Sequence, residues 1–339
     1  MFYLTKTSKI ILKNQNLFKD KNIIFAGNII DKIPIYLKTI DSIVYTKKYS
    51  YWNNMKKYLK NKIFLNFIFY KKYIFKCDTL IYFWPKNKLE AIFEFKNITS
   101  LLPIGFNIFI VGENKTGVKS SKKILKNIIK IKKIDNARNC ILNYGIIEKK
   151  IRFKISDFLN IYVWNNIKIA SLPGVFGFNK IDKGSELLIS TFRNNFIKGN
   201  VLDIGCGNGI LSTSILLQNH KLIKNILLID DNLTSIVSSK NTLKINNLKG
   251  IVFPSNIYSN IKYKNFFDLI VSNPPVHIGL RLNFKIITKI IKYSKYYLKF
   301  KGELRIVVNK SFSCKRIPFK NFSILKQNEK FIVYQIINQ

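Results

Sequence analysis

The segment Val201–Gly209 constrains the fold more than any other part of this chain. It starts with the apolar residues Val201 and Leu202, has glycine at every second position from Gly205, and leads into another apolar run. Glycine adopts backbone conformations that other residues avoid, so this order is typical of a buried strand that turns tightly into a helix. Such a strand belongs to an α/β sheet, and these sheets bind ligands at the carboxyl ends of their strands.

The residues around this turn predict a doubly wound α/β sheet in the second half of the chain. Apolar runs that fit strands occur at 200–204, 225–230, 250–253, 267–272 and 302–308, and helical patterns fit between them at 209–218, 232–246 and 283–299. The last run, 330–337, is predicted to pair beside 302–308. We therefore expect a seven-stranded mixed sheet that ends in an antiparallel hairpin.

The first half alternates in the same way, which predicts a second, mostly parallel sheet. Its predicted strands lie at 23–26, 42–45, 79–83 and 106–111, and its clearest helical patterns at 88–101 and 120–131. The turn after its first strand, 26–29, lacks successive glycines, so we expect no cofactor site there. A polar, irregular stretch at 156–166 divides the chain into predicted domains at 1–160 and 167–339.

Two carboxylates accompany the glycine turn. Asp203 lies at the end of the first strand, where its carboxylate can accept from a cofactor's amino group or order the nearby backbone. Asp230 ends the next strand, where a carboxylate can bind both hydroxyls of a ribose. A glycine pattern alone also fits an ordinary tight turn, but together with these acids Gly205, Gly207 and Gly209 favour a cofactor site. A pyrophosphate is bound by a helix N-terminus. The D-x-G-x-G-x-G order better fits S-adenosylmethionine, which has no phosphate.

Two further residues have two interpretations each. Asn256 follows the third strand, where it can bind an adenine edge or cap a turn. Phe176, in the loop before the domain's first helix, can cover the cofactor or pack in the core.

The loop Asn273-Pro274-Pro275 follows the fourth strand. The amine of a nucleobase is a poor nucleophile because its lone pair is conjugated with the ring. Two acceptors, the side-chain oxygen of Asn273 and the carbonyl of Pro274, would hold its hydrogens and aim the lone pair at a methyl group. Pro275 adds stiffness. Asn-Pro is also a common turn dipeptide, but its place at a strand end favours amine chemistry.

His277 lies two residues beyond this loop. It can act as an acid or base, contact the base, or only cap the loop. No metal or covalent nucleophile is needed for the predicted chemistry.

The formal net charge of +40 is compatible with a nucleic-acid partner. Only six of the basic residues are arginines, the side chain that phosphate recognition favours. The composition is also rich in Ile, Asn, Lys, Phe and Tyr, which an A/T-rich genome over-supplies, and the excess of lysine from this source explains part of the charge. The sequence has no apolar run that would span a membrane and no signal-peptide pattern. We expect a cytoplasmic protein.

Four further segments support a family resemblance, and two of them lie in the first half. They are 78–88, 111–118, 172–176 and 302–307. With the glycine turn and the Asn-Pro-Pro loop, they make the chain similar to class I methyltransferases, and specifically to the bacterial small-subunit ribosomal RNA guanine-N2 methyltransferases of the methyltransferase C family. The likeness covers nearly the full length.

This resemblance implies two tandem Rossmann-like methyltransferase domains in a monomer. The first has lost its cofactor site and assists folding or RNA binding. The second transfers a methyl group from S-adenosylmethionine to a guanine N2 in the 16S rRNA of the 30S subunit. Val276 stands where the family has an aromatic that stacks on the base, a contact worth about 1–3 kcal/mol.

Two alternatives remain from the residues. One keeps the chemistry but changes the substrate to guanine N2 in 23S rRNA or to an adenine or glutamine amine. The other is a non-catalytic RNA-binding or assembly factor, which Val276 favours and the intact residues of the cofactor turn oppose.

Overall fold

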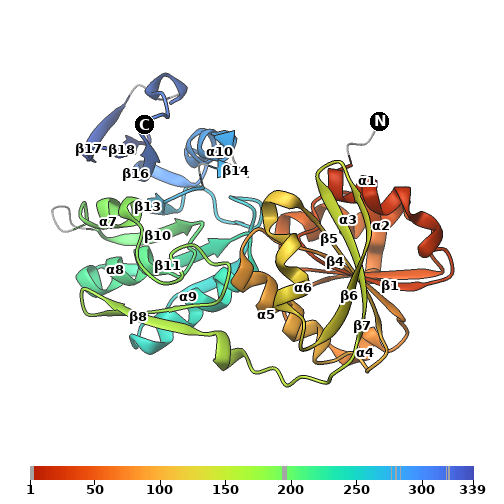
Figure 1. The fold of residues 1–339 in the computed structure, drawn as a ribbon. Coiled ribbons are helices and arrows are strands. Elements are labelled where there is room, and N and C mark those ends of the chain that lie inside the picture. The colour runs from red at the N-terminus through yellow and green to blue at the C-terminus, as the bar shows by residue number, and fades with distance from the viewer. Residues whose placement is uncertain are drawn as a thin grey trace. The chain divides into compact units, whose positions relative to one another are not determined.

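The computed structural model describes residues 4–339 except 193–196, 276, 279–280, 283, 318 and 320, and only the backbone at 277–278 and 281–282. These residues form two compact units, Met1–Phe158 and Leu159–Gln339. Figure 1 colours the first unit red to yellow and the second green to blue. None of the helices described is long and apolar enough to span a membrane.

The first unit contains a seven-stranded mixed sheet. Its strands are β1 (Asn22–Gly27), β2 (Asp41–Thr46), β3 (Ile63–Leu65), β4 (Thr79–Phe83), β5 (Asn107–Glu113), β6 (Ile129–Ala137) and β7 (Cys140–Ile147). The order across the sheet is β3-β2-β1-β4-β5-β7-β6. The first five strands in this order are parallel, and β7 and β6 are antiparallel to their neighbours.

Helices cover both faces of this sheet. They are α1 (Lys6–Lys13), α2 (Ile33–Tyr36), α3 (Tyr49–Leu59), α4 (Lys71–Ile74), α5 (Lys88–Thr99) and α6 (Ser121–Ile124). Along β1, Ile23 and Phe25 pack in the cluster that contains α1 and α3, whereas Ile24 and Ala26 pack against α5. Burial on both faces explains why this strand is an uninterrupted apolar run.

The predicted helix at 120–131 is wrong in its second half. Only α6 is helical there, and Ile129 already begins β6. From Ile129 to Ile131 buried and exposed residues alternate, which is the period of a strand. Arg138 and Asn139, with φ angles of 57° and 61°, form a two-residue turn that pairs β6 with β7. The backbone N–H and C=O groups of this segment form hydrogen bonds with β7 instead of with residues of a longer helix.

The second unit repeats the same sheet order. Its strands are β10 (Gly199–Ile204), β11 (Ile223–Asp230), β12 (Ile251–Pro254), β13 (Phe267–Ser272), β16 (Leu298–Asn309), β17 (Phe322–Gln327) and β18 (Phe331–Ile337). They lie in the order β12-β11-β10-β13-β16-β18-β17. β16 pairs antiparallel with β18, and β18 with β17. The predicted α/β fold, with a seven-stranded mixed sheet and a terminal hairpin, is confirmed.

Helices of the second unit also pack on both faces of its sheet. They are α7 (Lys183–Ile189), α8 (Ile210–Asn219), α9 (Leu233–Ile245) and α10 (Lys285–Ser294). Val201 of β10 lies in the cluster formed with α7, α8 and α9, and its neighbour Leu202 lies in the cluster formed with α10.

The stretch 156–166, predicted to be irregular, contains a strand. β8 (Asn160–Trp164) pairs antiparallel with β9 (Ile167–Ser171). Asn165 and Asn166 make the turn, with φ angles of 46° and 65°. Asparagine tolerates this left-handed conformation, so a polar dipeptide here marks a hairpin.

Gly27 closes β1 where the backbone of the neighbouring strand is very near. Its φ is +89°, and a Cβ would lie 2.2 Å from the carbonyl oxygen of Phe83. Gly105 has a similar φ of +85°, but a Cβ there meets no atom within 4 Å. A side chain at position 105 would therefore be disfavoured only by the positive φ. A side chain at position 27 would be disfavoured by the positive φ and by a clash with the backbone of β4.

We predict that Gly105→Ala lowers the free energy of unfolding by about 1 kcal/mol. Gly27→Ala should lower it by about 2 kcal/mol more, because the backbone of β4 must move. Thermal or urea unfolding of the full chain measures both. Equal losses in the two variants would contradict the role of the clash.

Candidate active site

Parallel pairing brings the predicted site residues to one edge of the second sheet. β10, β11, β12 and β13 all run in the same direction, so their carboxyl ends lie together. The glycine turn follows β10, Asp230 ends β11, Asn256 follows β12 and Asn273 follows β13. This is the edge at which α/β sheets bind ligands.

The three glycines of the turn have different surroundings. All have positive φ, of 73° at Gly205, 56° at Gly207 and 82° at Gly209. A Cβ at Gly205 would meet nothing within 4 Å, and one at Gly207 only the carbonyl oxygen of Phe176 at 3.9 Å. At Gly209 it would lie 3.1–3.2 Å from Ser239. Gly205 and Gly207 thus border open space, whereas Gly209 allows α8 to pack on α9.

Asp203 is completely buried beside this turn. Its Oδ2 accepts a hydrogen bond from the Ser212 hydroxyl at 2.7 Å, while its Oδ1 has no hydrogen-bond partner within the described part of the chain. Burial raises the pKa of Asp203 to about 7.

Asp230 is half-buried and rigidly held. Its Oδ2 accepts from the backbone N–H of Gly207 at 3.1 Å, and its Oδ1 from the N–H of Asn232 at 2.8 Å. Burial raises the pKa of Asp230 to about 6. Each oxygen has a second lone pair that remains able to accept a ligand hydroxyl.

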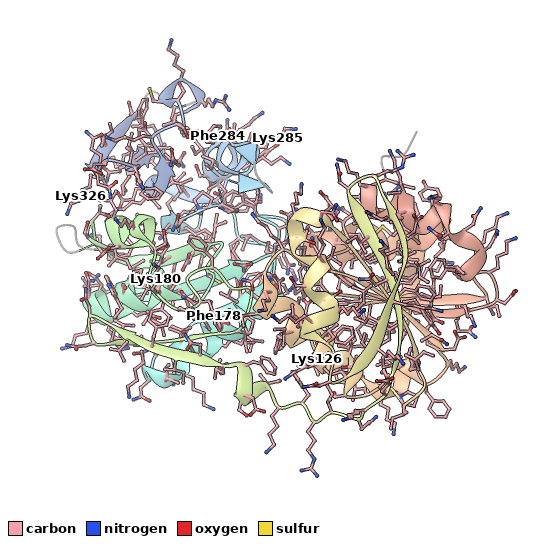
Figure 2. All side chains as sticks on the ribbon, in the orientation of Figure 1. Lys126, Phe178, Lys180, Phe284, Lys285 and Lys326 are labelled. Atoms are coloured by element: carbon pink, nitrogen blue, oxygen red, sulfur yellow. The ribbon has the colours of Figure 1, made fainter. Side chains whose placement is uncertain are left out.

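The loop 172–178 is fixed next to the glycine turn. The side-chain amide of Asn208 donates to the carbonyl of Gly177 at 3.1 Å, and the Tyr162 hydroxyl donates to the same carbonyl at 2.9 Å. Phe176, one residue earlier, is 65% exposed, so it does not pack in the core. Figure 2 labels Phe178 and Lys180, which follow in the same connection to α7.

Asn256 lies in an exposed turn after β12. Its backbone N–H donates to the Ser259 hydroxyl at 3.1 Å, and its carbonyl accepts from the Ser259 N–H at 3.1 Å. The side chains that form hydrogen bonds in this turn are those of Ser255, Ser259 and Asn260, and the Asn256 amide forms none with a described residue.

The side chain of Asn273 is held in one orientation. Its Nδ2 donates to Asp182 Oδ1 at 3.2 Å, to Asp182 Oδ2 at 3.1 Å and to the Ser185 hydroxyl at 2.8 Å. A carboxylate can only accept, so the amide nitrogen must face Asp182. The amide oxygen therefore points away from Asp182, and it receives no hydrogen bond from a described residue. Pro274 is buried and Pro275 exposed.

Asp182 and Ser185 are site residues that the sequence did not predict as such. Asp182 caps α7 by accepting from the N–H groups of Gly184 at 2.9 Å and Ser185 at 3.2 Å. Capping residues are common, and no local signal connects residue 182 with residue 273.

The backbone of His277 belongs to β14 (His277–Ile278), which pairs with β15 (Arg281–Leu282). Its side chain lies outside the described part of the structure, as do Val276 and Gly279.

Comparison with known proteins gives the family. The model of the Methyltransferase small domain matches residues 166–335, and that of the Methyltransferase small domain N-terminal matches 8–162. The Ribosomal RNA small subunit methyltransferase C of Buchnera aphidicola subsp. Schizaphis graminum is 48% identical over 341 residues, with 98% of each chain covered. The chain belongs to the ribosomal RNA small subunit methyltransferase C family. The resemblance inferred from its motifs is confirmed.

More distant relatives agree with this assignment to the methyltransferase C family. The Photorhabdus laumondii protein of the same name is 39% identical, with 99% of this chain and 98% of its own covered. A solved structure titled T. thermophilus 16S rRNA N2 G1207 methyltransferase superposes with a TM-score of 0.85, covering 99% of this chain and 93% of its own. At 17% identity this likeness shows that the two-domain fold is shared.

The raised pKa of Asp203 makes a testable contribution to stability. The folded chain favours the neutral acid, so this stability is complete below the ordinary pKa of 3.8 and is lost as pH rises through about 7. Asp203→Asn is always neutral. We predict that its melting temperature, relative to the native chain, rises between roughly pH 4 and 8, since each pKa unit corresponds to about 1.4 kcal/mol.

Asp41→Asn is the control for this measurement. A hydrogen bond from Lys62 lowers the pKa of Asp41 below 3.8, so its titration lies below the window used. Its melting difference should stay constant over the same range. A constant difference for Asp203→Asn would contradict the assigned cause.

Proposed function

We propose that this chain transfers a methyl group from S-adenosylmethionine to the N2 amine of a guanine in 16S rRNA. The observation that carries the proposal is the fixed amide of Asn273, whose oxygen has no donor in the described structure. The curated relatives are named ribosomal RNA small subunit methyltransferase C, and the T. thermophilus structure is titled a complex with AdoMet and guanosine.

The glycine-turn residues fit S-adenosylmethionine. Gly205 and Gly207 leave room for a ligand against the backbone. Asp230 offers acceptor lone pairs for ribose hydroxyls, and the buried Oδ1 of Asp203 has no hydrogen-bond partner among the residues that the structure describes. When bound, the cofactor supplies a methyl group activated by its positive sulfur.

Three more residues complete this proposed cofactor site. Gly209 keeps the turn tight by letting α8 approach Ser239. Phe176 presents an exposed ring from the loop beside Gly207 and covers the ligand. Asn256, exposed at the end of β12, offers its amide to the adenine edge.

Asn273 and Pro274 hold the amine to be methylated. The Asn273 Oδ1 and the Pro274 carbonyl accept its two hydrogens, which aims the nitrogen lone pair and favours pyramidal geometry. These interactions strengthen as the new bond forms, so they lower the barrier rather than only binding the substrate. Pro275 limits movement of the loop. His277 lies two residues after Pro275 in the chain, and we assign to its imidazole the proton that the amine releases.

Among the described residues of the first unit, the strand ends equivalent to Asp203 and Asp230 carry no carboxylate. Gly27 and Ile204 are the last residues that β1 and β10 pair with β4 and β13, so Ala26 stands where the second unit has Asp203. With these strands so aligned, the register to β2 and β11 puts Lys47 where the second unit has Asp230. A cationic ammonium cannot accept from ribose hydroxyls.

Lys47 also fills the equivalent space. It is buried and forms salt bridges to Glu90 and Glu94 of α5, and only about 10 Å³ of cavity remains beside it. We infer that 1–160 is a degenerate methyltransferase domain, and that 167–339 performs catalysis as part of a cytoplasmic monomer acting on 30S subunits.

Transfer of tritium from labelled S-adenosylmethionine tests the function. We expect label on 30S subunits that lack the modification, at a guanine located by mass mapping, and none on 50S subunits. Asn273→Ala should lower kcat about 100-fold, as loss of one preorganised transition-state contact does. Its calorimetric affinity for S-adenosylmethionine should be unchanged. Absence of transfer by the native chain, or no binding of the cofactor, would overturn the proposal.

Asp182→Asn tests the orientation of Asn273. Asparagine caps a helix as well as aspartate does, so α7 and the melting temperature should be preserved. Its amide nitrogen would face the nitrogen of Asn273 and favour the flipped amide, which presents a donor to the amine. We predict a fall in kcat of at least about tenfold with little change in KM for S-adenosylmethionine.

Asp182→Ala is the comparison, because it removes the cap as well. It should lower the free energy of unfolding by about 1 kcal/mol, the cost of a lost cap, and lower the melting temperature accordingly. Unchanged kcat in Asp182→Asn would show that Asp182 serves only as a cap.

A further inference from the structure

The first unit has an open hollow at the carboxyl ends of β4 and β5. Its volume is about 260 Å³, and three lysines line it: Lys86, Lys88 and Lys115. Trp84 and the hydroxyl residues Thr116 and Ser120 complete its polar and aromatic lining.

Two segments of the family resemblance meet at this hollow. Residues 78–88 contain β4 and the loop after it, and residues 111–118 contain the end of β5 and the following turn. They are far apart in sequence, and the proposed catalytic site in the second unit uses neither. β4 and β5 pair in parallel, so their carboxyl ends lie side by side.

The hollow is positively charged. Lys86 and Lys88 are exposed, and neither has an ion-pair partner in the described part of this unit. Lys115 pairs with Glu113 at 2.9 Å, which leaves two uncompensated lysine charges. No carboxylate or amide side chain is among the lining residues. A base edge presents donors as well as acceptors, whereas a phosphate presents only acceptors, which suit the ammonium groups of these lysines.

In the sheet of the first unit, the hollow lies at the strand end that corresponds to the Asn273 loop in the sheet of the second unit. Gly27 and Phe83 are the last residues paired between β1 and β4, as Ile204 and Ser272 are between β10 and β13. The next residue is Trp84 in the first unit and Asn273 in the second. The Trp84 ring is only 3% exposed and cannot accept from an amine.

We propose that this hollow is a phosphate-binding site that takes a backbone phosphate of the RNA substrate. Lys86 and Lys88 neutralise the phosphate, and the Ser120 hydroxyl, which makes no hydrogen bond within the described part of the unit, donates to it. In this proposal the first unit holds the RNA backbone at the strand ends that correspond to the Asn273 loop of the second unit. The identity of the RNA rests on the proposed function.

The test is the salt dependence of RNA binding by the full chain. The probe is a labelled single-stranded RNA oligonucleotide, titrated over a range of salt concentrations. For Lys86→Gln with Lys88→Gln we expect an affinity loss of about tenfold and a slope of log K against log salt that is smaller by about 1 to 2.

The matched control is Lys19→Gln with Lys38→Gln. These exposed lysines precede β1 and β2, at the opposite edge of the same parallel strands, and the same number of charges is removed. Equal effects of the two double variants would show a nonspecific charge contribution and overturn the proposal. Melting temperatures check that both variants fold.

A second experiment adds inorganic phosphate or AMP as a competitor and measures how much of the RNA stays bound. A site for RNA phosphate should require millimolar concentrations of either competitor. Tight competition by AMP would instead identify a free nucleotide as the ligand and contradict the proposal. Binding is measured without methyl transfer, and calorimetry with S-adenosylmethionine on the same variants should be unchanged, so failure of this site is distinguishable from failure of the proposed function.

Discussion

The parallel pairing of β10 with β11 and β13 is the constraint on which the second unit depends. It places the carboxyl ends of these strands at one edge, so that residues far apart in sequence meet there. Asp230 accepts from the backbone of the glycine turn, and Asn273 from the end of β13 donates to Asp182. If the strands were antiparallel, alternate strand ends would lie at opposite edges and no common site could form.

The two units show how one topology serves different chemistry. Their seven strands follow the same order. At equivalent strand ends the first unit has Lys47 and Trp84 where the second has Asp230 and Asn273. The fold depends on the apolar strand residues, which both units keep, and the site depends on the few residues that follow each strand. Those can change without loss of the fold.

Asp203 and Asp230 are acidic side chains in a setting that disfavours their charged form. The chain carries 58 basic residues, yet neither carboxylate forms a salt bridge in the described part of the structure. Burial without a cation raises the pKa of both groups and lowers the stability of the folded state above neutral pH. Such groups are typical of sites whose partner is a ligand.

The sequence by itself determined most of the buried strands, the glycine turn and the place of Asn273, because apolar runs and glycine positions are local signals, but it did not predict the strands β3, β7, β8, β9 and β17. It misassigned 129–131 as helix, since only pairing with β7 makes that segment a strand. Tertiary structure alone decided the orientation of Asn273, because its partner Asp182 is 91 residues away. It also decided that Lys47 is buried against Glu94 of α5. These contacts depend on distances between elements, which no short stretch of sequence encodes.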